Sequence, residues 1–345
     1  MIKSLSVLKQ ISDEQGIDSA TATAINDVSQ LLEDALSDLE LQLMTGLEEA
    51  PQPVSDITSY ILDAGGKRIR PSMCILGAKA FSGTATPTDL AVVCELLHNA
   101  TLLHDDVIDE GDRRRGKPSA RMVWSNALSI LGGDYMLMRC VEIMSLKPAI
   151  YMQRFVGTLK ALVEGEIIQL KLRESVETRR EDYFAIVKGK TSSLFGFAAF
   201  CGAMTGGASE EDVQEMTAFG ENIGIAFQLI DDVLDFSSDA EVLGKNLLAD
   251  ISQGKMTLPV IMAAAQNRLV KNSLMRLTAG DESIDECAAA VADAVMRSNA
   301  LESTRLEARR HTDLAMQSLE RLSTANDAVT AILRQLALSL LQRGN

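Results

Sequence analysis

Two aspartate triplets with the same spacing are the groups in this chain with the clearest capacity for chemistry. The first is Asp105-Asp106-x-x-Asp109, and the second repeats the DDxxD pattern at residues 231–235, each after an apolar segment. Residues four apart on a helix project from one face, so Asp105 and Asp109 should lie one turn above each other. Carboxylates this close repel, and the helix macrodipole disfavours them at a C-terminal end. The pattern therefore favours neutralisation by divalent cations.

The few, hard oxygen ligands of such a triplet suit Mg²⁺, which keeps several waters and shares its remaining sites with substrate phosphates. A single triplet is equally well explained as a solvated acidic helix end. Two helices that end in the same triplet can face each other across a bundle and hold a small cluster of Mg²⁺ ions. The predicted metal ligands are Asp105, Asp106, Asp109, Asp231, Asp232 and Asp235.

Basic residues gather near glycines and offer binding groups for an anionic substrate. Arginine matches phosphate oxygens bidentately, whereas lysine supplies a point charge. Each cluster alone is better explained as a solvated helix end, but together with two acidic triplets in a chain of net charge −15 they favour an anion site. The clusters are at residues 65–71 (GGKRIRP), 113–115 (RRR), 188–191 (KGKT), 244–245 (GK) and 254–255 (GK). No Ser, Cys or His stands in a recognisable triad context, so nucleophilic catalysis has no candidate.

The composition favours an all-helical protein and argues against several functions. Apolar residues make up 46% of the 345 residues but aromatic residues only 4%, which suits helices better than sheets. The net charge of −15 repels nucleic acid and anionic lipid. The five cysteines are scattered, as in a reducing compartment. The N-terminus lacks a signal-peptide pattern and the least polar segment, 194–208, is too short to span a bilayer, so we expect a cytoplasmic protein.

The acidic and basic groups must be held in place by helices, which the periodicity of apolar residues predicts. Apolar residues recur at helical spacing in residues 28–47, and similar patterns return along most of the chain between Gly and Pro breaks. We expect a single large all-α bundle over residues 26–345, preceded by an N-terminal arm at residues 1–25. Residues 265–345 carry no chemical motif and are expected to form packing helices or a partner surface. His311, in this region, is expected at the surface.

Five ordered segments between Gly65 and Pro259 resemble the trans-type polyprenyl diphosphate synthase family. The resemblance implies that family's all-α isoprenoid synthase fold with a central active-site cavity, and its homodimers. It implies the condensation of isopentenyl diphosphate with an allylic prenyl diphosphate. The segments are GGKRIRP, ELLHNATLLHDDVIDEGDRRRG, KGKTSSLF, FQLIDDVLD and GKNLLADISQGKMTLP.

Residue by residue, the resemblance implies that both aspartate motifs bind three Mg²⁺ ions and the allylic diphosphate, although the residue that matches Asp235 lies farther from the metals in some family members. The residues implied in catalysis are Asp105, Asp106, Asp109, Lys190, Asp231, Asp232 and Lys245. Those implied to hold the allylic diphosphate are Arg114, Lys190, Thr191, Gln228, Lys245 and Lys255. Those implied to hold isopentenyl diphosphate are Lys67, Arg70, His98 and Arg115.

Product length should depend on Ala100 and Thr101, which lie roughly 6–7.5 Å below Asp105 along its helix. Short-chain relatives place an aromatic residue near this level, so the aliphatic residues here favour a long all-trans product. A tight helix contact would also explain the small Ala100. The alternatives are a farnesyl or geranylgeranyl diphosphate synthase, a noncatalytic subunit of a heteromeric prenyl synthase, whose DDxxD motifs are typically eroded, and a terpene cyclase, which usually lacks the second DDxxD.

Overall fold

The structure is a computed structural model that describes residues 19–48, 50–81, 86–173, 175–236, 251, 253–279 and 284–342. These residues are almost entirely helical, and the only strands among them are the two-residue β1 (Arg113–Arg114) and β2 (Lys117–Pro118). The all-α prediction is confirmed. No helix in the described residues is long and apolar enough to cross a membrane.

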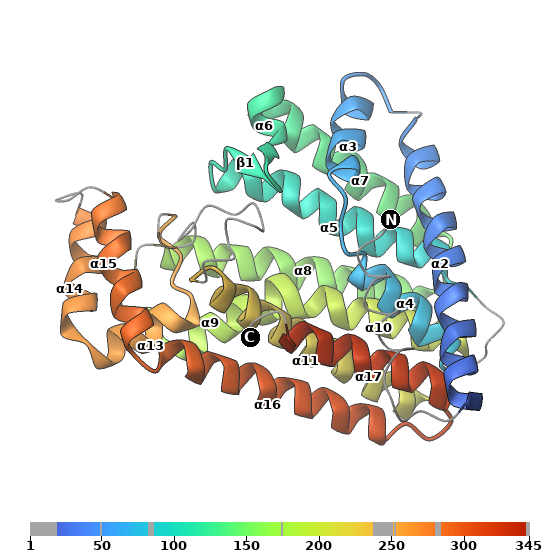
Figure 1. Ribbon diagram of the computed structural model, residues 1–345. Helices are drawn as coiled ribbons and strands as arrows, with labels where there is room; N and C mark the ends of the chain where they lie inside the picture. Colours follow the sequence, from blue (N-terminus) through green and yellow to red (C-terminus); the bar gives the residue numbers. More distant parts are fainter. Residues whose placement is uncertain are drawn as a thin grey trace. The chain divides into compact units, whose positions relative to one another are not determined.

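The chain forms two compact units, each assembled from separate segments. The first unit comprises residues 1–157, 194–220 and 315–339, and the second comprises 158–193, 221–314 and 340–345. The predicted division at residue 25 stays a prediction, since residues 1–18 lie outside the described part and residues 19–25 begin a helix. The helices (Figure 1) are α2 (Ser19–Glu48), α3 (Val54–Asp63), α4 (Ile69–Lys79), α5 (Thr88–Ile108), α6 (Ala120–Val123), α7 (Asn126–Ser145), α8 (Ala149–Leu172), α9 (Arg180–Val187), the π-helix η1 (Lys188–Ser192), α10 (Ser193–Gly206), α11 (Glu210–Leu234), α13 (Leu258–Gln266), α14 (Arg268–Ala279), α15 (Ile284–Arg297), α16 (Ala300–Glu320) and α17 (Asp327–Gln342).

The first unit is built around α4, α5 and α10, most of whose residues are buried. Small residues let α4 and α10 approach closely, because a Cβ at Gly202 would lie 2.4 Å from the carbonyl oxygen of Cys74. Helices α5 and α7 lie side by side (Figure 1). A side chain larger than hydrogen at Gly133 would meet the His104 ring, so this contact also depends on glycine.

Four of the five cysteines are buried free thiols in this first unit. Burial raises the pKa of the Cys74, Cys140 and Cys201 thiols well above the usual value, which keeps them protonated and unreactive. The side chain of the fifth, Cys287, lies outside the described residues.

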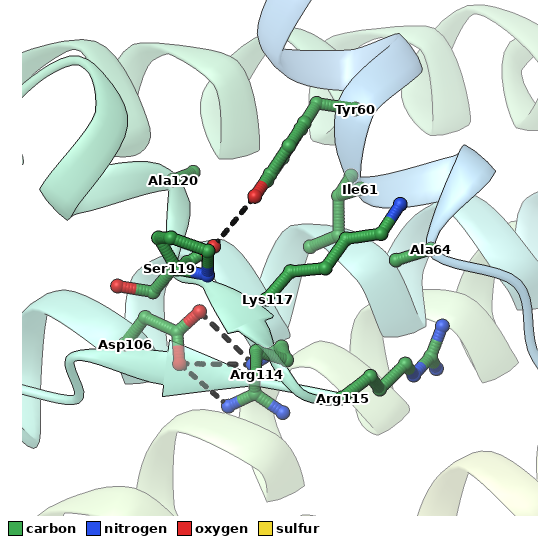
Figure 2. A pocket seen from close by; sticks show the side chains of 10 residues that line it. Tyr60, Ile61, Ala64, Asp106, Arg114, Arg115, Lys117, Ser119 and Ala120 are labelled. Atoms are coloured by element: carbon green, nitrogen blue, oxygen red, sulfur yellow. Dashed lines mark hydrogen bonds and ion pairs between the residues drawn. The ribbon is translucent and has the colours of Figure 1, made fainter. Parts of the chain in front are cut away.

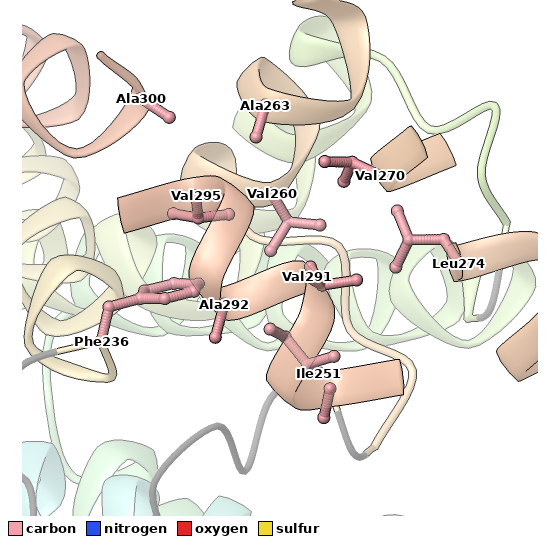
Figure 3. Close-up of a cluster of buried hydrophobic side chains, with 11 residues drawn as sticks. Phe236, Ile251, Val260, Ala263, Val270, Leu274, Val291, Ala292, Val295 and Ala300 are labelled. Atoms are coloured by element: carbon pink, nitrogen blue, oxygen red, sulfur yellow. The ribbon is translucent and has the colours of Figure 1, made fainter. Parts of the chain in front are cut away.

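The second unit has its own apolar core, shown in Figure 3. Aliphatic residues of α13, α14 and α15 meet beside Phe236 and Ile251. The packing role predicted for the C-terminal region therefore holds for α14 and α15. The prediction for His311 is wrong: it is buried in α16, where Nδ1 pairs with Oδ1 of Asn222 at 2.8 Å.

Candidate active site

The first triplet stands where the last turn of α5 ends. Asp109 caps the helix, and its backbone N–H donates to the carbonyl of Asp105 at 2.8 Å, which confirms the predicted one-turn separation. Both residues are half-buried. Their carboxylates are therefore within reach of a ligand as well as of the protein.

Asp106, between them, is only 3% exposed and is bonded within the protein. The Nε of Arg114 lies 2.9 Å from both of its carboxylate oxygens, and Nη2 lies 2.7 Å from Oδ1 (Figure 2). Charge-assisted bonds of this kind fix both side chains. The spacing predicted metal binding for Asp106, and the family resemblance implied diphosphate binding for Arg114. Neither indicated that the two side chains pair.

A small hairpin presents Arg114 and Arg115. Strands β1 and β2 pair antiparallel, with Arg114 opposite Lys117. The turn residues Arg115 and Gly116 both have positive φ, 51° and 79°, as a two-residue hairpin turn requires. The hydroxyl of Tyr60, on α3, donates to the carbonyl of Pro118 at 2.7 Å (Figure 2). Sequence analysis missed this hairpin, because strands of two residues show no alternation; the only signal was the Arg-Gly pair.

A small pocket lies between this hairpin and α3. Asp106, Arg114 and Arg115 line this pocket together with Tyr60 and Lys117 (Figure 2). The pocket thus brings a residue of the first triplet together with one residue predicted for each diphosphate.

The glycine loop before α4 lies against the same arginines. Gly65 has a φ of 75°, and a Cβ at Gly66 would lie 3.5 Å from Nη2 of Arg115. The guanidinium of Arg70 lies over the Phe195 ring, 4.6 Å from its centroid.

The pKa of His98 reflects the positive charge of the arginines around it. Burial, and then the nearby Arg70, Arg115 and Arg114, lower the pKa of His98 well below its usual value. The imidazole is therefore neutral near pH 7. The structure thus gathers three residues predicted to hold isopentenyl diphosphate, namely Arg70, His98 and Arg115, and Lys67 belongs to the adjoining glycine loop.

The second triplet, in the second unit, repeats the geometry of the first. Helix α11 ends at Leu234, and the backbone N–H of Asp235 donates to the carbonyl of Asp231 at 3.2 Å. Asp231 is half-buried, whereas Asp232 and Asp235 are each 2% exposed. Here the middle and the last aspartate are both enclosed by protein, whereas in the first triplet only the middle one is.

A hydrogen-bond chain connects the second triplet to the π-helix η1. Thr191 Oγ1 donates to Oε1 of Gln228 at 2.9 Å, and Nε2 of Gln228 donates to Oδ1 of Asp232 at 2.9 Å. Tyr183 donates to the other Asp232 oxygen at 2.6 Å. Sequence analysis named Thr191 and Gln228 but missed Tyr183, which stands seven residues before Lys190.

Lys190 forms an ion pair with Glu166 of α8. Close helix packing supports this pair, because a Cβ at Gly189 would lie 2.6 Å from the carbonyl oxygen of Ala161. Glu166 was not singled out by the sequence, where it is one acidic residue of many. The charge of Lys190 is therefore already paired with Glu166. A diphosphate that binds Lys190 would have to share the lysine with Glu166 or displace the glutamate.

The remaining predicted residues are placed as follows. Lys245 lies outside the described residues, and Lys255 is half-buried just after Gly254, whose φ is 70°. Ala100 is 2% exposed, and Thr101 donates through Oγ1 to the carbonyl of His98 at 2.7 Å.

The donors of the two triplets fit Mg²⁺ rather than an all-protein metal cage. No group of three or more His, Cys, Asp or Glu residues arranged to hold a metal occurs in the described part of the chain. Asp105, Asp109 and Asp231 are half-buried, and each offers carboxylate oxygens, which are hard donors. Each triplet thus supplies only a few protein ligands to a metal ion. Mg²⁺ accepts such a site because it takes its other ligands from water and substrate phosphates.

The model of the Polyprenyl synthetase family matches residues 51–295. The chain belongs to that family, as its motifs predict. It is 36% identical over 305 residues to the all-trans-nonaprenyl-diphosphate synthase (geranyl-diphosphate specific) of Rhodobacter capsulatus, covering 86% of this chain and 92% of that protein. It is 33% identical over 301 residues to the octaprenyl diphosphate synthase of Escherichia coli, covering 86% and 93%.

Solved structures agree with the sequence relatives. A decaprenyl diphosphate synthase from Rhodobacter capsulatus matches with a TM-score of 0.84 and 32% identity, covering 93% of this chain and 99% of its own. A polyprenyl synthase from Caulobacter crescentus, complexed with calcium and isoprenyl diphosphate, matches with a TM-score of 0.86 and 30% identity, covering 92% and 97%. The predicted isoprenoid synthase fold is confirmed.

Proposed function

We propose that this protein is a magnesium-dependent trans-prenyltransferase that condenses isopentenyl diphosphate with an allylic prenyl diphosphate to give a long-chain all-trans polyprenyl diphosphate. The observation that carries the proposal is the cluster of Arg70, Arg114 and Arg115 around His98, beside the first triplet. In a chain of net charge −15, a positive cluster that lowers a histidine pKa marks an anion site. Membership of the polyprenyl synthetase family supports this assignment.

Asp105, Asp109 and Asp231 are the carboxylates that we propose hold Mg²⁺, with Asp106, Asp232 and Asp235 completing the triplets. When bound, Mg²⁺ supplies the positive charge that stabilises a departing diphosphate. Three ions are proposed by resemblance to the family. Calcium in the Caulobacter crescentus relative supports the use of a divalent cation.

The chain's own residues bind and orient the two diphosphates in this proposal. Lys67, Arg70 and Arg115 hold isopentenyl diphosphate, and neutral His98 contributes a hydrogen bond without adding charge. Arg114, Lys190, Lys245 and Lys255 hold the allylic diphosphate with Thr191 and Gln228.

Cationic side chains lower the barrier by stabilising the charge that develops on the leaving diphosphate. The allylic carbon–oxygen bond breaks, the double bond of isopentenyl diphosphate forms the new carbon–carbon bond, and a proton passes to the released diphosphate. Such a reaction needs no protein nucleophile.

The residues along α5 below the first triplet support a long product. Ala100, Leu97, Leu96 and Val93 are buried and none is aromatic. Each isoprene unit that is added lengthens an apolar tail, which needs an apolar path. The named nonaprenyl, octaprenyl and decaprenyl relatives support the same assignment.

We also propose a cytoplasmic homodimer. Helix α7 exposes Leu131, Met138 and Val141 on one face, and α8 exposes Val156 and Val163. Rows of exposed apolar side chains at helical spacing are typical of interfaces. Light scattering after size-exclusion chromatography tests the dimer, and a monomeric mass would exclude it. The four free thiols support a reducing compartment.

The test of function is product analysis. Purified protein is incubated with isopentenyl diphosphate, Mg²⁺ and geranyl, farnesyl or geranylgeranyl diphosphate, and the dephosphorylated products are separated by chromatography. Products well beyond geranylgeranyl length are expected. Products that stop at farnesyl or geranylgeranyl length would establish the short-chain alternative, and no product would favour a noncatalytic subunit.

A further inference from the structure

Arg68 joins the glycine loop to the start of α4 in a conformation that arginine rarely adopts. Its φ of 48° and ψ of 35° lie in the left-handed region, where Cβ crowds the following carbonyl oxygen. Its side chain is nevertheless buried, with 4% of the residue exposed. A non-glycine residue persists in this region when surrounding contacts over-determine it.

Contacts from three helices hold the Arg68 guanidinium. Nε donates to Oε1 of Glu40 at 2.6 Å and Nη2 donates to Oε2 at 3.0 Å, which makes a bidentate pair with α2. Nη1 donates to Oε1 of Glu95 on α5, and Nη2 lies 3.5 Å from the carbonyl oxygen of Leu62 on α3. Burial alone would lower the pKa of Arg68, but the hydrogen bond to Glu40 and the charge of Glu95 raise it. Arg68 is therefore charged and neutralised where it lies.

The Glu95 contact reaches the helix that carries the predicted substrate histidine. Asn99 donates through Nδ2 to Oε1 of Glu95 at 3.1 Å and to its carbonyl at 2.8 Å. Asn99 is fully buried and follows His98 directly in α5. Arg68, Glu95 and Asn99 thus form one buried polar network under this part of α5.

The Arg68 guanidinium also lies close to the glycine loop. A Cβ at Gly66 would lie 3.2 Å from Nη1 of Arg68 and 3.5 Å from Nη2 of Arg115. A side chain at Gly66 would therefore press on the Arg68 guanidinium and come into ordinary van der Waals contact with that of Arg115. The glycine loop therefore packs close to the guanidinium groups of both Arg68 and Arg115.

We infer that Arg68 is a positioning residue for isopentenyl diphosphate: through Glu40 and Glu95 it holds the loop so that its neighbours Lys67 and Arg70 meet the diphosphate. Arg68 does not bind the substrate itself, because two carboxylates already neutralise it. Loss of this support should weaken isopentenyl diphosphate binding selectively. The inference rests on the proposed function, since it assumes that isopentenyl diphosphate is the ligand of Lys67 and Arg70.

The experiment measures the two substrates separately. Isopentenyl diphosphate alone does not react, so calorimetric titration with Mg²⁺ present gives its Kd without turnover, and steady-state kinetics give the KM of the allylic substrate. Arg68→Gln should raise the Kd for isopentenyl diphosphate by about tenfold or more, because a loop displaced by about an ångström loses its aligned contacts. The allylic KM should stay within about twofold. Arg68→Lys, which keeps the charge without the planar fork, should fall between.

Two further variants complete the design. Glu40→Gln removes the charge from a half-exposed partner and should raise the Kd for isopentenyl diphosphate by about threefold, so the test stands even where Arg68→Gln does not fold. Arg297→Gln breaks the exposed pair with Asp293 and serves as the matched control, with both constants unchanged.

Each outcome decides between the two proposals. A purely structural Arg68 would lower the melting temperature while both substrate constants stay as in the wild type, and this would overturn the inference. Equal weakening of both substrates would also overturn it. Wild-type binding of isopentenyl diphosphate without product formation would overturn the proposed function alone, because the positioning role would still be read from the Kd. No binding by the wild type would overturn both.

Discussion

The hydroxyl of Tyr183 donates a 2.6 Å hydrogen bond to Oδ2 of Asp232, the middle aspartate of the second triplet. In the first triplet, Arg114 binds the middle aspartate, Asp106, in the corresponding way. In each triplet the middle carboxylate is buried and held by protein, and the first is half-buried. The middle aspartates therefore fix the helix end, which leaves the first aspartates best placed to meet a metal ion.

Tyr183→Phe should lower kcat by about tenfold and raise the Mg²⁺ concentration for half-maximal rate, because Asp232 loses a donor that orients the triplet. Leaving a buried oxygen without this donor should cost about 1–3 kcal/mol of unfolding free energy. Tyr151→Phe is the control, since it also loses a tyrosine hydroxyl contact, the part-buried 3.2 Å contact with Thr205, within the first unit. Tyr151→Phe should keep the wild-type Mg²⁺ dependence. If Tyr183→Phe keeps it too, Tyr183 does not orient the second triplet.

Asp105→Ala and Asp231→Ala should each reduce turnover by about 100-fold or more while circular dichroism stays helical, because each removes a ligand of metal ions used chiefly in the transition state. Asp293→Ala, at an exposed ion pair, is the control and should retain full activity. Wild-type turnover in both triplet variants would favour the noncatalytic-subunit alternative.

Exhaustive chelation should abolish product formation, because carboxylates and diphosphates repel each other without intervening cations. Adding Mg²⁺ back should restore the rate. The thermal midpoint of the protein with and without Mg²⁺ and inorganic diphosphate gives a second readout, and the pair together should raise it more than either alone. Undiminished turnover after chelation would refute the metal-cluster proposal.

The parts of the site that sequence analysis predicted are those set by local spacing. Asp105 and Asp109 fall one turn apart because the apolar period of α5 fixes the helix and its end. Tyr183 and Asp232 are 49 residues apart, and no local pattern brings a tyrosine and a carboxylate together over that distance. Whether a residue such as Asp106 binds a metal or a neighbouring arginine depends on tertiary packing, as does its burial.

The misjudged His311 shows the same limit of local patterns. A lone histidine on an amphipathic helix carries no sign of the face to which it belongs. Its burial depends on Asn222 of α11, 89 residues away, which supplies the hydrogen-bond partner at 2.8 Å.

Burial of His311 should make the protein sensitive to acid. Burial and the charge of Arg310 lower the pKa of His311 from 6.5 to about 4, with smaller effects from Glu307, Lys188 and Arg180. The unfolded chain therefore binds a proton more readily than the fold, so this contribution to stability is complete above pH 6.5 and is lost as the pH falls from 6.5 towards 4.

His311→Gln, which keeps a polar group facing Asn222, should flatten this part of the pH–stability curve, as measured by urea unfolding at pH 8, 6 and 4.5. The wild type should lose more unfolding free energy than the variant over that range. Parallel curves for the two proteins would mean that another group causes the acid sensitivity.

The last prediction concerns product length, which we attribute to the residues one turn below Asp105. Ala100→Tyr places a ring in the proposed path of the growing tail and should shift the products to short prenyl diphosphates without loss of the first condensation. Ala100 is 2% exposed, however, and an added ring in a packed interior costs about 1–3 kcal/mol, so reduced stability is expected as well.

Thr101→Tyr provides the matched variant because Thr101 is half-buried and its hydroxyl donates to the carbonyl of His98 within the same helix. Thr101→Val, of nearly the same volume, separates loss of that hydroxyl from added bulk and should keep the wild-type length. If the tail passes this level of α5, at least one tyrosine variant must shorten the product while it still consumes the first isopentenyl diphosphate. Wild-type product length in both folded tyrosine variants would mean that the tail leaves the site by another route, and the long-chain assignment would then rest on the relatives alone.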